Sequence, residues 1–283
     1  MNIEFLCAIS TNSSHYAEYL KLTAESLSTS KSVIKWKCAL GLDRDDKYEE
    51  PKGFTNLGIA KNKESDHGSL NHASTMHELI KGSDKKSDIT IIVDADIAML
   101  KKGWDVDVIR YLEKYDSFGL GWGAWDNKYM NFPSIMFIAF RTELISELDF
   151  DLFPVPRKKE EGISRYRASI HDSDVCNVPA GTIIKKDTGW KLPYSFREKN
   201  KTGFCVPKIK VDSKEAQLPF KNEKQKKYCF LKPTHMSEYI LDNDLYATHL
   251  QASRVKPFDG ENSLVWRCRI NKYIKDKYGI KLC

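Results

Sequence analysis

The sequence predicts an α/β fold in which a mostly parallel sheet is covered by helices on both faces. Strand-like apolar runs alternate with segments of helical periodicity from the N-terminus to about residue 150. The runs are almost continuously apolar, as expected for strands that are buried on both faces of a sheet. With 283 residues, of which 41% are hydrophobic, the chain is long enough for one large domain with a sizeable core.

The expected elements follow from these patterns in chain order. Apolar runs predict strands over residues 3–10, 33–43, 55–61, 88–100 and 132–140. Helical spacing of apolar residues predicts helices over residues 13–30, 68–83, 101–116 and 142–150. After Pro154 the periodicity weakens, so we expect one domain, residues 1–283, with a C-terminal elaboration.

The cysteines and the apolar runs bear on the compartment of the protein. The seven cysteines are scattered and show no CxxC spacing, which argues against a disulfide framework or a zinc module. No apolar run approaches the roughly 18 to 20 residues of a membrane helix. The N-terminus lacks the basic region of a secretory signal. We therefore expect a cytoplasmic protein without disulfides or an integral membrane segment.

Positive charge is concentrated in one segment. The chain has a net charge of +6, yet residues 197–232 alone hold 11 Lys or Arg against 4 Asp or Glu. The rest of the chain is close to neutral, so we expect the basic segment to be a surface excursion. It could contact an anionic acceptor, an anionic surface or a nucleic acid.

Two aspartates, Asp94 and Asp96, interrupt the apolar run over residues 88–100. In an extended strand residues i and i+2 point the same way, so both carboxylates can lie on one face as the strand leaves the sheet. Two hard oxygen ligands suit Mg²⁺ or Mn²⁺ held jointly with a diphosphate. Alternatively they cap the following segment or pair with lysines. Asp105 and Asp107 repeat the spacing, but we expect them on the solvated surface of a helix.

Other polar residues lie where parallel strands place ligands, at their carboxyl ends. His249, after a strand-like run, could complete a metal shell, and an imidazole favours Mn²⁺ over Mg²⁺. Backbone and side-chain donors near a helix start could bind a phosphate or a sugar hydroxyl, although the same residues could be a cap and a helix face. The candidates near the helix start are Ser69, Asn71 and His72, and those at the ends of strands are Ser10, Thr11 and Asp43.

Three residues of a glycine- and tryptophan-rich stretch could form an acceptor site. Trp122 and Trp125 could stack on a sugar ring, and Asp126 could hydrogen-bond its hydroxyls. Burial of the tryptophans in the core is the competing interpretation.

The run "VDAD" after a βαβ module and "HLQASRVKPF" near the end resemble the GT-A glycosyltransferases that use nucleotide sugars. The second piece is similar to the His…Lys-Pro-aromatic element of glycogenin-like enzymes and bacterial galactosyltransferases. The resemblance implies a GT-A fold in which Asp94, Asp96 and His249 bind Mn²⁺ or Mg²⁺. It places Lys256 against the donor diphosphate. The charge of Arg254 suits the same diphosphate, which a cation held by Asp94 would also contact.

The chain departs from this element in three ways. The His-to-Lys spacing is one residue longer, Ala252 or Ser253 stands where a glycine is usual, and Phe258 replaces tryptophan.

The same resemblance divides the chain and assigns its substrates. Residues 1–100 would form the nucleotide-sugar-binding half, with Ser10, Thr11 and Asp43 at the base and ribose. Residues 101–283 would bind a glycan, glycolipid or glycoprotein acceptor. Asp172 and Asp174 match the place of the catalytic base of inverting enzymes, whereas the glycogenin-like element favours retention without such a base.

Two other classes compete with a UDP- or GDP-sugar-dependent glycosyltransferase. A phosphatase or phosphotransferase of the haloacid-dehalogenase type also carries DxD after a strand. That class places the motif on its first strand and has Thr or Val where this chain has Ala98. A nucleic-acid-binding protein could use the aromatic residues among the lysines of the basic segment, but no known binding motif is present.

Overall fold

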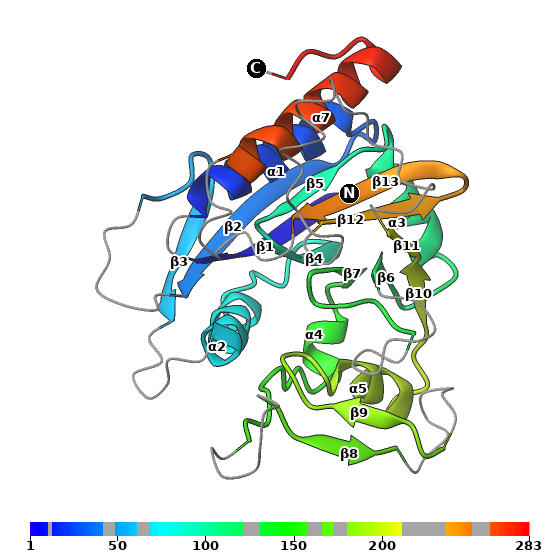
Figure 1. Cartoon of the computed structure of the whole chain (residues 1–283). Helices are drawn as coiled ribbons and strands as arrows, with labels where there is room; N and C mark the ends of the chain where they lie inside the picture. The colour runs from blue at the N-terminus through cyan, green and yellow to red at the C-terminus, as the bar shows by residue number, and fades with distance from the viewer. Residues whose placement is uncertain are drawn as a thin grey trace.

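A computed structural model describes the chain in nine stretches (Figure 1). They form a seven-stranded sheet, a four-stranded sheet and a two-stranded sheet, with helices packed on the largest sheet. The described residues are 1–10, 13–41, 49–60, 68–121, 131–157, 166–171, 180–210, 236–250 and 261–282.

The seven-stranded sheet has the order β10-β6-β7-β4-β1-β2-β3. Strands β4, β1, β2 and β3 are parallel, and so are β10 and β6, whereas β7 runs antiparallel to both of its neighbours. This arrangement confirms the predicted mostly parallel sheet. The strands are β1 (Asn2–Ser10), β2 (Val33–Gly41), β3 (Thr55–Ala60), β4 (Ile89–Asp94), β6 (Ser117–Leu120), β7 (Phe137–Arg141) and β10 (Gly203–Val206).

Helices cover both faces of this sheet, as predicted. Successive residues of β1 point to opposite faces of the sheet. Phe5 belongs to the same hydrophobic core as Trp104 and Trp266, whereas Leu6 belongs with Ala73 to the core on the other face. One face carries α1 (Ser14–Leu27), α3 (Trp104–Leu112) and α7 (Glu261–Tyr278), and the other carries α2 (Gly68–Lys81), α4 (Leu144–Glu147) and α5 (Leu192–Glu198). In Figure 1 α7 lies along α1, and α2 lies across the sheet from them.

The strand predicted over residues 88–100 is divided between two sheets, which corrects the prediction. Strand β4 ends at Asp94, Ala95 and Asp96 form a turn, and β5 (Ile97–Met99) then joins the four-stranded antiparallel sheet β11-β12-β13-β5. The other strands of that sheet are β11 (Lys208–Lys210), β12 (Met236–Leu241) and β13 (Asp244–Leu250). The chain changes sheets at the two aspartates.

A small lobe extends the α2 side of the molecule. It contains α5 and the two-stranded sheet of β8 (Ala168–Ile170) and β9 (Ile183–Lys185), which lie beyond α4 in Figure 1. One of its contacts with α2 is made by Thr188, whose hydroxyl donates to the carbonyl oxygen of Ser69 over 2.9 Å. The lobe is therefore tied to the N-terminal turn of α2.

The basic segment begins inside the fold and not as a surface excursion. Residues 203–206 form β10 at the edge of the main sheet, and residues 208–210 form β11 in the second sheet. Strand β11 carries Lys208 and Lys210, and edge strands tolerate lysine, so the basic composition of the segment did not indicate a strand there. Residues 211–232 of the predicted excursion lie outside the described residues.

The described part of the chain contains free thiols at Cys7, Cys38, Cys205 and Cys268. Within the same residues, no helix combines the length and the apolar character needed to cross a membrane.

Asp105 and Asp107 lie on α3 as predicted, but both are buried, which corrects the expectation of a solvated surface. Asp107 contacts Lys101 and Arg110 at 2.8 and 2.7 Å. Asp105 is 0% exposed and accepts hydrogen bonds from the Ser28 hydroxyl and from the backbone N–H of residues 29 and 30. Burial raises the pKa of Asp105, but these hydrogen bonds outweigh it and hold the pKa below 3.8.

Replacing Asp105 with asparagine is expected to lower the free energy of unfolding by about 1.5 to 3 kcal/mol, because hydrogen bonds to a charged acceptor are lost. The folded pKa is below the unfolded one, so the carboxylate stabilises the protein above about pH 4. This contribution disappears as the pH falls through the folded pKa. Urea denaturation of both proteins between pH 7 and pH 3 measures it, with Asp276→Asn, on an exposed part of α7, as the control.

Candidate functional site

Asp94 and Asp96 are held by the backbone at the point where the chain leaves the main sheet. The N–H of Asp94 donates to the carbonyl oxygen of Met136 over 2.9 Å, which continues the ladder between β4 and β7. The carbonyl oxygen of Asp96 accepts from the N–H of Leu250 over 2.9 Å, which begins the ladder between β5 and β13. Both carboxylates therefore project from a turn between two hydrogen-bonded ladders, and not from one face of a continuous strand.

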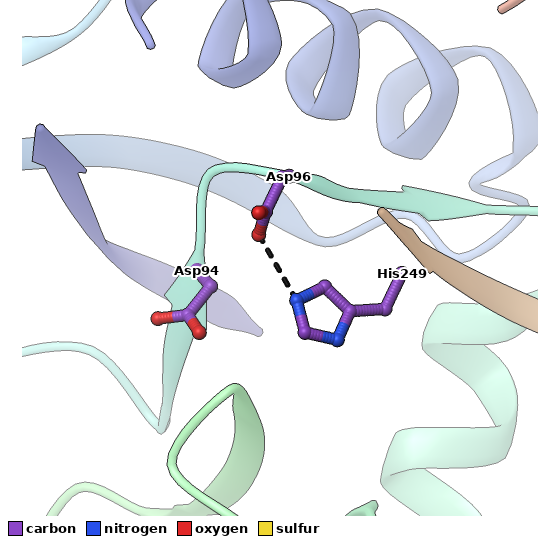
Figure 2. A group of neighbouring side chains, drawn as sticks. All are labelled: Asp94, Asp96 and His249. Atoms are coloured by element: carbon purple, nitrogen blue, oxygen red, sulfur yellow. Dashed lines mark ion pairs between the residues drawn. The ribbon is translucent and has the colours of Figure 1, made fainter. Parts of the chain in front are cut away.

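His249 reaches the same point from β13, which pairs with β5 so that His249 lies opposite Ile97. Its Nε2 lies 3.1 Å from Oδ1 of Asp96. Figure 2 shows these two side chains pointing toward each other, with Asp94 beside them at the end of β4. One ligand atom from each of the three residues lies within 4.8 Å of the others. The three predicted metal ligands thus meet at one place.

The backbone around His249 is supported from α7 and β12. The Thr248 hydroxyl donates to the carbonyl oxygen of Ser237 over 2.9 Å and accepts from the indole N–H of Trp266 over 3.2 Å. Trp266 is fully buried, and His249 is 8% exposed. These contacts hold the backbone of β13 next to the imidazole.

The charges at the site act on one another. Burial lowers the pKa of His249, but Asp96 and, more weakly, Asp94 raise it, so that it lies above 6.5. The charge of Lys208 on β11 acts in the opposite direction. Beneath the site, burial raises the pKa of the Cys7 thiol well above 9.0, and Asp94 and Asp96 add to the effect.

The donor set fits a divalent cation. Two carboxylates and one imidazole supply the oxygen and nitrogen ligands that Mn²⁺ accepts, and Mg²⁺ accepts the oxygens. The side chains of Asp94 and Asp96 are 22% and 16% exposed, so solvent and a ligand can reach the carboxylates. Three protein ligands leave coordination positions for substrate oxygens.

The residues predicted at the start of α2 occupy different surroundings. His72 contacts Asp94, with Nε2 2.8 Å from Oδ1. Ser69 exchanges a hydrogen bond with the Tyr166 hydroxyl. Asn71 is 2% exposed, and its carbonyl oxygen accepts from the Thr75 hydroxyl over 2.7 Å. Of the three, only His72 contacts one of the aspartates directly in the described structure.

Ser10, at the end of β1, is engaged in a local turn. Its N–H donates to the Ser13 hydroxyl over 2.8 Å, and that hydroxyl donates to the Ser10 carbonyl oxygen over 2.8 Å. The turn chemistry explains why a serine occurs at this position. A role for Ser10 at the nucleotide stays a prediction.

Nine predicted site residues fall in stretches that the structure does not describe. They include the proposed general bases, the acceptor residues and the two cations of the C-terminal motif. They are Thr11, Asp43, Trp122, Trp125, Asp126, Asp172, Asp174, Arg254 and Lys256.

Three residues near the site were not among the sequence candidates. Tyr166 and Thr188 hold Ser69, and Lys208 influences His249. The basic composition of residues 197–232 was the available signal for Lys208. Nothing in the local sequence marks Tyr166 or Thr188, because their partner is on a distant helix.

No protein-family profile matches the sequence, and no curated protein is significantly similar to it. Solved structures do match. Mannosyltransferase PcManGT from Pyrobaculum calidifontis, in complex with GDP-Man and Mn²⁺, aligns at a TM-score of 0.39 and 10% identity, over 53% of this chain and 48% of that one. S. aureus TarS in complex with UDP-GlcNAc aligns at 0.34 and 13%, over 54% and 50%. An active-site mutant of LgtC aligns at 0.35 and 11%, over 53% and 60%.

These matches fall among the GT-A glycosyltransferases that the sequence motifs resemble. The aligned region spans about half of the first two proteins, 48% and 50% of their chains.

Proposed function

We propose that this protein is a metal-dependent glycosyltransferase that moves a sugar from a nucleoside-diphosphate sugar to a hydroxyl group of a glycan, glycolipid or glycoprotein. The observation that supports the proposal most directly is the meeting of Asp94, Asp96 and His249 within 4.8 Å where β4 leaves the main sheet. Carboxyl ends of parallel strands are where α/β sheets bind ligands.

The three side chains would hold Mn²⁺, or Mg²⁺, on one side and leave the other side to the donor. When bound, the cation offsets the negative charge that develops on the departing nucleoside diphosphate. The imidazole of His249 favours Mn²⁺, because Mg²⁺ prefers oxygen ligands. The buried backbone ladders on both sides of the aspartates keep the carboxylates in place before the donor binds.

Positive side chains would bind the same diphosphate. Lys208 lies on β11, in the same four-stranded sheet as His249, and its charge lowers the pKa of that histidine. Arg254 and Lys256, five and seven positions after His249 in the sequence, are proposed to contact the diphosphate oxygens. The basic segment would thus contribute to the donor site through Lys208 of β11.

The two halves of the chain would divide the substrates. We assign residues 1–100 to the nucleotide sugar, with Ser10, Thr11 and Asp43 near the base and ribose. Residues 101–283 would bind the acceptor, with Trp122, Trp125 and Asp126 at a sugar ring. Asp172 or Asp174 would remove the proton of the attacking hydroxyl if the reaction inverts the anomeric carbon.

A donor screen tests the proposal. UDP-, GDP- and CMP-sugars are each mixed with the protein and Mn²⁺, and nucleotide release and melting temperature are measured. We expect one donor class to raise the melting temperature, because a ligand that binds only the folded state stabilises it. The same donor should give nucleotide release that EDTA removes and fresh Mn²⁺ restores. No stabilisation and no release with any donor would contradict the proposed function.

A further inference from the structure

His72 is in direct contact with one of the two aspartates. It lies on the second turn of α2, and its Nε2 is 2.8 Å from Oδ1 of Asp94. Both side chains are mostly buried, at 17% and 22% exposure. A hydrogen bond of this length between two mostly buried groups restricts the rotation of a carboxylate more than a hydrogen bond on the surface does.

The helix that carries His72 is held on two sides. The Ser69 hydroxyl bonds to the Tyr166 hydroxyl, and the Ser69 carbonyl oxygen accepts from Thr188 over 2.9 Å. Ser69 and His72 are three positions apart and therefore lie on the same side of the helix. On the sheet side, a Cβ atom at Gly41 would come within 2.5 Å of the Thr75 hydroxyl, so α2 packs closely on the end of β2.

We propose that His72 is a positioning residue for the metal centre. It would orient the carboxylate of Asp94 and would contact neither the cation nor the donor. A carboxylate has two oxygens, so Asp94 can accept a hydrogen bond from His72 with one and offer the other to a cation. This inference rests on the proposed metal site, and it replaces the sequence-based expectation that His72 contacts the donor.

The geometry separates His72 from the ligands. The three residues whose ligand atoms lie within 4.8 Å of one another are Asp94, Asp96 and His249, and His72 is not in this group. Its imidazole bonds to the carboxylate of Asp94, which is itself one of the three ligands. Groups that hydrogen-bond metal ligands set the orientation of those ligands, and their loss typically weakens metal binding by about 10- to 100-fold.

Mn²⁺ titration of the donor-free protein, followed by electron paramagnetic resonance, tests the inference. His72→Ala is expected to raise the dissociation constant by about 10- to 100-fold. His72→Gln keeps an N–H donor of similar reach and should recover most of the affinity. The matched control is His77→Ala, on the same helix, whose exposed ring lies 5.9 Å from that of Phe153 and away from Asp94. Circular dichroism melting checks that each variant folds.

The nitrogen couplings in the electron spin-echo spectrum of bound Mn²⁺ distinguish a positioning residue from a ligand. We expect the coupling of one imidazole, from His249, in the wild type, and the same coupling in His72→Ala at saturating Mn²⁺. Loss of a nitrogen coupling in His72→Ala would make His72 a ligand and overturn the inference. Unchanged affinity in that variant, with the wild type binding normally, would also overturn it. A wild type that binds no Mn²⁺ would instead refute the metal site itself.

Discussion

Asp96→Asn is expected to reduce metal-dependent nucleotide release by about a thousandfold. Asp96 contacts His249 directly, and its carbonyl oxygen is fixed by the N–H of Leu250. Asparagine retains the shape of the side chain and one ligand oxygen, but it removes the negative charge that attracts the cation. Metal stabilisation of a developing negative charge is worth several kcal/mol, and each 1.4 kcal/mol is about a factor of ten in rate. Single-turnover release at saturating donor measures the effect.

Two variants separate charge loss at the site from a general loss of charge. Asp276→Asn removes a carboxylate that pairs with Lys272 on α7 and should leave the rate unchanged. His249→Ala should weaken Mn²⁺ binding and lower the rate, with partial recovery at higher Mn²⁺. If Asp96→Asn released nucleotide at the wild-type rate, the carboxylate would have no part in the reaction.

Trp266→Ala is expected to cause the largest loss of stability among the changes considered. The indole is 0% exposed, packs against the rings of Tyr16 and Tyr19 at 6.3 and 5.8 Å, and donates to the Thr248 hydroxyl. Truncating a buried tryptophan to alanine costs about 3 to 5 kcal/mol of unfolding free energy. For a chain of this size the melting temperature should fall by about 10 °C. Urea denaturation and calorimetry measure the two quantities.

Two further substitutions identify the source of this loss. Leu264→Ala, on the same helix with a side chain that is 59% exposed, should change the unfolding free energy by less than about 0.5 kcal/mol. Trp266→Phe retains much of the ring packing but removes the N–H, and should fall between the two. Equal losses for Trp266→Ala and Leu264→Ala would show that α7 does not anchor β13.

Trp266 also links stability to the proposed site. It bonds to Thr248, whose neighbour in β13 is His249. We therefore expect Trp266→Ala to weaken Mn²⁺ binding in the folded protein at low temperature, whereas Leu264→Ala should not.

The sequence by itself determined the class of the fold and the residue types of the site. Local periodicity is enough for this, because a strand buried on both faces must be apolar throughout and a covering helix must repeat every 3.6 residues. The run over residues 3–10 and the helix within residues 13–30 were predictable for that reason. The pair Asp94 and Asp96 was conspicuous because carboxylates at the end of an apolar run need partners.

Only the tertiary structure decided where the strands break and which distant side chains meet. The turn at Ala95 and Asp96 depends on the ladders with Met136 and Leu250, which no local pattern reveals. The burial of Asp105 depends on three donors in residues 28–30. The contact of His72 with Asp94 depends on the packing of α2 over the sheet. Contacts between segments far apart in the chain are set by the pairing of strands and the packing of helices, so they leave no periodic trace in either segment.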